Sequence, residues 1–117
     1  MKKLLLVTAL LTTSLVSIAG GFKNLQEAEV SGYLLGFCST KIGVETEGER
    51  RFDKIISKLA KTSIITSDIA VLEQPDSLEW GVFDKAKFTG YTDYHDGVQS
   101  FTFTQCLEFA QQLPEVK

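Results

Sequence analysis

The side chains with the clearest capacity for chemistry are two cysteines, Cys38 and Cys106, and a single histidine, His95. A thiolate beside an imidazole would be a nucleophile, and both residue types are also zinc ligands. The two cysteines lie far apart in the sequence, however, and lack the paired spacing of a structural zinc site. The third alternative is a disulfide, so the choice depends on the compartment in which the chain folds.

The N-terminus has the order of parts that is typical of a secretory signal peptide. Two lysines are followed by an apolar stretch at residues 4–18 without any acidic residue, and small residues lead up to Ala19. The stretch is shorter than the ~20 residues that a membrane-spanning helix needs. We therefore predict a signal peptide at residues 1–19, cleavage after Ala19 and a periplasmic or secreted single domain at residues 20–117, with no membrane contact after cleavage.

Export would decide the chemistry of the cysteines. In an oxidising compartment an even number of cysteines in a small domain normally pairs, and two cysteines allow only one pairing. Closing so long a loop would stabilise the fold by roughly 4 kcal/mol in the chain-entropy account of disulfides. We therefore predict a disulfide between Cys38 and Cys106 rather than a catalytic thiol.

The densest group of polar side chains is Asp93-Tyr94-His95-Asp96-Gly97. A calcium loop needs oxygen ligands at alternate positions, and His95 stands where an oxygen ligand is required. A role for His95 as general base needs a partner and a pocket, which the spacing does not supply. We therefore predict a surface turn at this point, with no metal and no cofactor.

The rest of the sequence carries no catalytic motif. It has no Gly-x-Ser-x-Gly turn, no phosphate-binding loop, no His-Glu-x-x-His and no dinucleotide fingerprint. The formal net charge of −3, without a dense basic run, is not the electrostatic footprint of a nucleic-acid-binding protein. The sequence therefore predicts a non-enzymatic protein whose partner is not a nucleic acid.

The elements that would position these residues are predicted to be helices. Apolar side chains recur at helical spacing in five stretches, at residues 24–40, 49–61, 67–73, 76–88 and 98–113. The second helix is expected to end at Lys61, because the β-branched run at residues 62–66 leaves its apolar stripe. Residues 41–48 and 89–97, which are polar and rich in glycine, are predicted to be loops.

Three helix starts have the spacing of a capping box, in which a polar N-cap is followed three residues later by Glu or Gln. Asn24 precedes Glu27 in this way, Asp76 precedes Glu79, and Asp96 precedes Gln99. We therefore expect Asn24 to cap the first helix and Asp96 to cap the last.

Small residues recur every four positions on the first predicted helix, at Ala28, Gly32 and Gly36. Small side chains let another backbone approach closely. The approaching element would be either a helix of the same chain or another molecule, including a second copy in a homodimer. Gly32 and Gly36 are therefore candidate partner contacts.

Aromatic side chains are concentrated between residues 80 and 109. Most of them are expected in the core, because a small domain needs large side chains to bury enough apolar area. The alternative is a partly exposed patch or groove for a protein partner or an apolar ligand. Trp80, Tyr91 and Tyr94 are the candidates for such contacts.

One short stretch resembles a known family. The sequence Gly-Tyr-Leu-Leu-Gly at residues 32–36, on a predicted helix of a small exported protein, resembles a helix of the periplasmic immunity proteins of type VI secretion systems. The cysteine pattern and the C-terminal ending of that family are not matched here. At the level of fold, the chain is also similar to small helical acid-stress chaperones of the periplasm that carry one disulfide.

Together these observations predict an all-α domain of four to five helices, with the first and last helices joined by the disulfide. The predicted function is that of an exported protein which binds another protein, as an inhibitor, an immunity factor or a chaperone-like module. The alternative is a carrier of a small apolar ligand within the helical bundle. That alternative would require an internal cavity lined by Phe83, Phe88 and Phe103.

Overall fold

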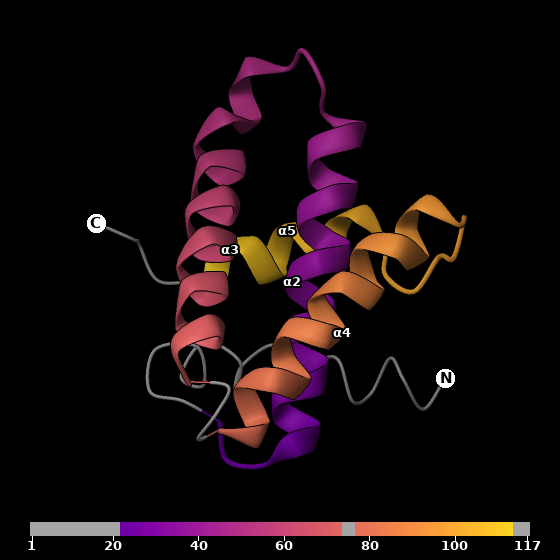
Figure 1. Ribbon diagram of the computed structural model, residues 1–117. Helices are drawn as coiled ribbons and strands as arrows, with labels where there is room; N and C mark the ends of the chain where they lie inside the picture. Colours follow the sequence, from indigo (N-terminus) through magenta and orange to yellow (C-terminus); the bar gives the residue numbers. More distant parts are fainter. Residues whose placement is uncertain (1–21, 74–76, 114–117) are drawn as a thin grey trace.

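The computed structural model describes residues 22–73 and 77–113 of the chain. The predicted signal peptide lies outside these residues. The described part is entirely helical (Figure 1), which confirms the predicted fold class. Its elements are α2 (Leu25–Glu45), a 3₁₀ turn η1 (Arg50–Phe52), α3 (Asp53–Glu73), α4 (Leu78–His95) and α5 (Phe103–Gln112).

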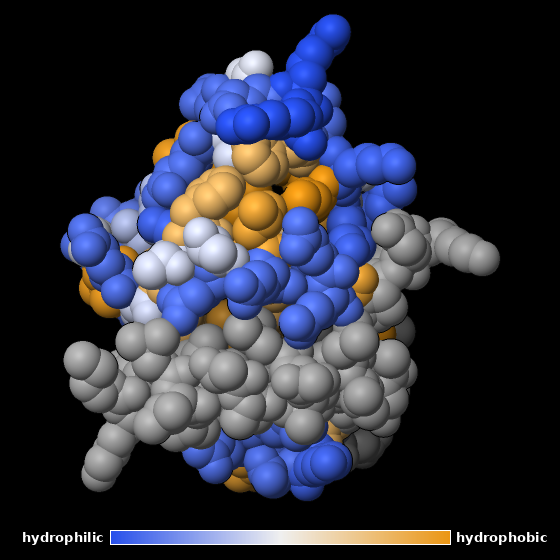
Figure 2. Space-filling view, turned by 180° about the vertical axis from the view of Figure 1, so that it is seen from behind, coloured by the Kyte–Doolittle hydropathy of each residue, from blue (hydrophilic) through white to orange (hydrophobic). Residues whose placement is uncertain are grey.

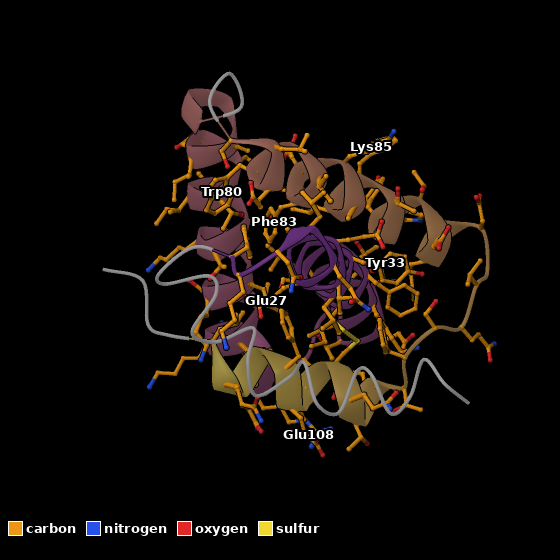
Figure 3. The ribbon with its side chains drawn as sticks, turned by 90° about the horizontal axis from the view of Figure 1, so that it is seen from below. Glu27, Tyr33, Trp80, Phe83, Lys85 and Glu108 are labelled. Carbon is orange, nitrogen blue, oxygen red and sulfur yellow. A yellow bond between two sulfur atoms is a disulfide. The ribbon has the colours of Figure 1, made fainter. Side chains whose placement is uncertain are left out.

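Helix α2 lies at the centre of the fold. Figure 3, which looks along α2, shows α4 on one side of it and α5 on the opposite side, with α3 on a third side. The core is built around it, with Leu34, Leu35, Phe37 and Ile42 fully buried. A helix with three helical neighbours needs apolar or small residues on several faces, which explains why α2 has no well-defined polar side.

The predicted disulfide is present between Cys38 on α2 and Cys106 on α5. The two Cα atoms are 4.9 Å apart, and both side chains are fully buried. The bond therefore joins the first and last described helices inside the core, as predicted. Because the cysteines are paired and shielded from solvent, neither is a nucleophile or a metal ligand.

The closest approach of α2 and α4 is a contact between their backbones. A Cβ atom added at Gly32 would overlap the carbonyl oxygen of Phe83, and one added at Gly36 would overlap that of Lys87. A Cβ added at Gly90 of α4 would in turn overlap the carbonyl oxygen of Tyr33. Both glycines of α2 are thus buried against a helix of the same chain.

Both segments predicted to be loops are largely helical, and the prediction was wrong at these points. Helix α2 continues to Glu45 because Ile42, one turn after Cys38, is fully buried and prolongs the apolar stripe. Helix α4 continues to His95 because Gly90 is a packing position against α2 rather than a helix stop. Tyr94 then packs on Phe37 with ring centroids 5.7 Å apart, which places the last turn of α4 on the core.

Helix α3 is unbroken where two helices were predicted. Beyond Lys61 the inward positions are taken by Thr62 and Thr66, which are 3 % and 1 % exposed, while Ile64 is 62 % exposed. The hydroxyl of Thr66 donates to the carbonyl oxygen of Thr62 at 2.7 Å, so the burial of Thr66 leaves no unpaired donor. The hydroxyl residues thus replace the apolar stripe, which is why the pattern suggested a helix end.

The caps of the helices were predicted in part. Asp76 lies outside the described residues, and the N-cap of α4 is Ser77. The side chain of Asn24 accepts a hydrogen bond from the backbone N–H of Glu27 at 2.8 Å, as expected. The cap predicted at Asp96 was wrong, because α4 runs through to His95 and α5 begins only at Phe103. The N-cap of α5 is Thr102, which forms a capping box with Gln105.

The glycine contact generates a stability prediction. Gly36→Ala should destabilise the fold by about 2 kcal/mol or more, because the new Cβ must push the α4 backbone away. Gly43→Ala on the same helix is the matched control: nothing lies within 4 Å of the added Cβ, so better helix propensity should raise stability by up to ~1 kcal/mol. Chemical denaturation followed by circular dichroism measures both, and equal effects of the two substitutions would contradict the backbone contact.

Candidate functional site

An open groove of about 510 Å³ lies between α2 and α4. Its α2 wall consists of Gln26, Glu29, Val30 and Tyr33. Its α4 wall consists of Val82, Lys85, Ala86 and Thr89, and Ser100 and Phe101 close one end. Figure 3 shows Tyr33 on the side of α2 away from α3, so the groove occupies the side of the central helix that α3 leaves open.

Tyr33 is held in a fixed position at the closed end of the groove. Its hydroxyl donates to Asp93 Oδ2 at 2.6 Å and shares a second hydrogen bond of 2.6 Å with Ser100 Oγ. Its ring packs on Phe37 and Phe101, with centroids 5.9 Å away in each case. These contacts join α2, the last turn of α4 and the segment before α5, so the shape of the groove exists without a ligand.

The protonation state of Tyr33 follows from this environment. Burial, and then the hydrogen bond to the Asp93 carboxylate, raise the pKa of Tyr33 from 10.0 to about 12. The phenol is therefore neutral at physiological pH and is neither a base nor a nucleophile. It contributes a rigid, partly polar wall.

The rims of the groove carry charges of opposite sign. Glu29 on α2 and Lys85 on α4 are both exposed. Neither takes part in an ion pair within the described residues, where the pairs are Lys41–Glu45, Arg51–Glu49 and Lys87–Asp84. Figure 3 shows the Lys85 side chain extending away from α4 into solvent. The groove therefore has an apolar floor between one acidic and one basic edge.

A smaller hollow of about 320 Å³ lies on the other side of the α2–α4 contact, next to Lys87. The ammonium of Lys87 donates to the carbonyl oxygen of Ser63 at 3.1 Å and to the hydroxyl of Ser67, and lies 3.7 Å from Asp84 Oδ1. Burial lowers the pKa of Lys87. Because the ammonium group of Lys87 donates to residues of α3, it joins α3 to α4 and is not available to bind a ligand.

The aromatic residues predicted as contacts are not brought together. Trp80, at the start of α4, packs on Phe22 and Phe83 with centroids 4.9 and 5.2 Å away. Tyr91 is exposed, and its ring meets the edge of His95 at 4.5 Å. Tyr94, near the end of α4, donates from its hydroxyl to Glu45 Oε2 at 3.0 Å. Tyr91 and Tyr94 thus lie next to each other around His95, with centroids 4.5 and 5.8 Å from it, whereas Trp80 lies at the other end of α4, so the three rings do not form one patch.

The predicted turn at residues 93–97 contains no assembled site. Asp93 is the acceptor for Tyr33, while His95 and Asp96 are exposed at the end of α4. Nowhere in residues 22–73 and 77–113 do three or more side chains come together that could hold a metal ion.

The three phenylalanines proposed to line an internal ligand cavity lie in three different surroundings. Phe83 is fully buried in the core, whereas Phe88 is 68 % exposed. Phe103 packs against Phe52 with ring centroids 5.7 Å apart, between α5 and the 3₁₀ turn η1. They do not line a common cavity.

A second apolar area lies on the back of the molecule, the face that α5 crosses. Figure 2 shows hydrophobic atoms there, bordered by hydrophilic ones. The apolar residues of α5 that are partly exposed, Phe103 and Leu107, already pack against the core, as do Ile55 and Ile56 of α3. These four side chains are already used in packing, so the groove is the better candidate site.

Most groove residues were not singled out from the sequence. Both walls follow the i, i+3, i+4, i+7 spacing of one helix face, at residues 26, 29, 30 and 33 and at residues 82, 85, 86 and 89. That spacing was the available signal, but five of its eight positions are polar or small. An apolar stripe was therefore not recognised.

The Tyr33 network generates a pH prediction. Between pH 10 and 12 an unfolded chain loses the phenolic proton while the folded chain keeps it, so this contribution to stability is complete below pH 10 and is lost as the pH rises towards 12. Tyr33→Phe should be less stable at neutral pH by about 1–3 kcal/mol, because Asp93 and Ser100 lose a partner. Its unfolding free energy should also fall less steeply across the alkaline window, and an unchanged slope in denaturant titrations would contradict the assignment.

No helix among the described residues is long and apolar enough to cross a membrane. The chain matches no known protein family, no curated protein and no solved structure. A functional proposal therefore rests on the geometry of the groove and on the sequence.

Proposed function

We propose that this protein is an exported, periplasmic protein-binding module, and that the groove between α2 and α4 receives an apolar segment of its partner. The proposal rests on the combination of an apolar floor with one acidic and one basic rim. A desolvated apolar centre surrounded by a polar rim is the usual anatomy of a protein–protein interface.

The groove suits a macromolecular partner better than an enclosed small molecule. Val30, Val82, Ala86 and Phe101 supply apolar surface, yet the hollow opens to solvent rather than into the core. Small-molecule sites bury most of the ligand surface, which an open groove does not do. A partner that continues beyond the groove covers its rims as well.

The groove is also preformed. The α2–α4 backbone contact fixes the distance between its walls, and the hydrogen bonds of Tyr33 fix its closed end. A site that needs little ordering on binding loses less entropy, so more of the contact energy appears as affinity. A rigid groove of this kind supports an inhibitor, an immunity factor or a chaperone-like module, all of which act by binding alone.

The proposed location rests on two features. The order of parts in residues 1–19 is typical of a signal peptide, and a buried disulfide is compatible with folding in an oxidising compartment. Production of the full-length chain in a bacterial host should yield a periplasmic protein whose N-terminus is Gly20. Intact mass measurement on the periplasmic fraction checks this, and an uncleaved chain in the membrane fraction would contradict it.

If the partner binds in the groove, substitutions of groove residues should weaken its binding, and substitutions elsewhere should not. Val82→Arg places a charged side chain on the apolar floor and should weaken binding by at least about tenfold. Thr89→Arg, at an exposed position of the same wall, should act in the same direction without disturbing the core. Val44→Arg is the control, since Val44 is 50 % exposed on α2 and is not part of the groove.

The measurement is affinity capture from envelope extract with each oxidised variant on the resin. A protein held by wild type and Val44→Arg but lost with both groove variants supports the proposal. Circular dichroism and thermal unfolding of each variant exclude a general loss of structure. A captured protein that remains with both groove variants would overturn the assignment of the binding site.

A further inference from the structure

The walls of the groove determine what kind of segment fits between them. On α2 the lining residues Gln26, Glu29, Val30 and Tyr33 form one helical stripe over two turns. On α4 the lining residues Val82, Lys85, Ala86 and Thr89 form a second stripe with the same spacing. Two helix faces with i, i+3, i+4, i+7 spacing on either side of a groove form the surface on which a third helix packs.

The backbone of the walls argues against an extended occupant. A partner segment in β conformation binds by adding a strand, and it needs a row of free backbone N–H and C=O groups. The walls belong to α2 and α4, whose backbone groups are used within the helices. An amphipathic helix instead binds through side chains at successive turns, which is what both walls present.

The place of the groove in the fold supports the same conclusion. Helix α2 has α4 and α5 on opposite sides and α3 on a third side (Figure 3). The side with Tyr33 is not covered by a helix in the described part of the chain, and the groove lies there. A helix bound in the groove would cover this side of α2.

The rim charges define the flanks of that helix. Glu29 on the α2 wall and Lys85 on the α4 wall are exposed and not ion-paired within the described residues. A bound helix with a basic residue on one flank and an acidic residue on the other matches both rims. A helix with like charges on both flanks meets repulsion at one of them, and rim charges of this kind select between partners.

We propose that the groove binds an amphipathic helix of the partner protein, with apolar side chains at i, i+3 or i+4, and i+7, a basic residue on the flank facing Glu29 and an acidic residue on the flank facing Lys85. This inference rests on the proposed function and names the chemistry of the partner segment. It makes the two rim residues the determinants of specificity.

Three hydrocarbon-stapled helical peptides of about 16 residues test the proposal, because shorter isolated helices are marginal in water. They share one apolar face of alanine, valine and leucine and differ only in their flanks. The first carries lysine on one flank and glutamate on the other, the second carries lysine on both, and the third carries glutamate on both. Fluorescence anisotropy with the oxidised protein measures each affinity, and the mixed peptide can bind in the direction that pairs both flanks.

Wild type should bind the mixed peptide best and each like-charged peptide about fivefold more weakly. Glu29→Lys makes both rims basic, so the doubly acidic peptide should become the preferred one. Lys85→Glu makes both rims acidic, so the doubly basic peptide should become the preferred one. Glu108→Lys is the control: it reverses a charge on α5, on the far side of α2 from the groove (Figure 3), and should leave the wild-type order unchanged.

The outcomes separate this inference from the proposed function. If all three peptides bind equally to wild type and both rim variants, and Val82→Arg abolishes binding, the groove is a binding site but the charged-flank helix is wrong. If no peptide binds while capture from envelope extract still depends on Val82 and Thr89, the occupant is not a helix. If neither peptide binding nor capture depends on these residues, both proposals fail.

Discussion

The contact between the backbones of α2 and α4 is the constraint on which the rest of the structure depends. Three glycines, Gly32, Gly36 and Gly90, remove every side chain from the point where the two helices meet. Side chains on either side of that point hold the helix surfaces apart, so a hollow forms on each side of the contact. In one hollow, Lys87 of α4 donates hydrogen bonds to α3. The other hollow is the open groove.

Glycine in the middle of a helix costs about 1 kcal/mol relative to alanine, so this contact requires support from elsewhere. The support lies around the last turns of α4, where Tyr33 bonds to Asp93 and Tyr94 bonds to Glu45. Each hydrogen bond joins α2 to α4 across a sequence separation of 49 residues or more. The disulfide acts on the opposite face of α2 and holds α5 against it. Helix α2 is thus fixed from both sides, and this makes the groove rigid.

The sequence predicted features that depend on local chemistry or on simple counting. The all-α fold followed from helical spacing, the cap at Asn24 from its offset to Glu27, and the Cys38–Cys106 bond from the presence of only two cysteines. The sequence-based prediction was wrong where one residue type can occur in two structural settings. Gly90 suggested a loop but is a packing position, and Thr62 and Thr66 suggested a helix end but line the inner face of α3.

The groove could not be predicted for a different reason. Equivalent positions on its two walls, such as Gln26 and Val82, are 56 residues apart in the sequence, and each wall contains polar residues that resemble an ordinary solvent-facing surface. Only the place where α2 meets α4 decides that Val30 and Val82 share one hollow. The glycines set that place. Because a glycine has no side chain, its position in the sequence does not indicate which helix it will contact.

The position of the disulfide has a consequence for the order in which an exported chain matures. Cys38 lies on the first described helix and Cys106 on the last, with a sequence separation of 68. A chain that crosses a membrane N-terminus first delivers α2, α3 and α4 before Cys106 arrives. Under the proposed export, Cys38 would stay an unpaired thiol during that interval, and the face of α2 that α5 later covers would stay open. The Cys38–Cys106 bond can therefore form only once α5 is available, so it comes late in the formation of the core.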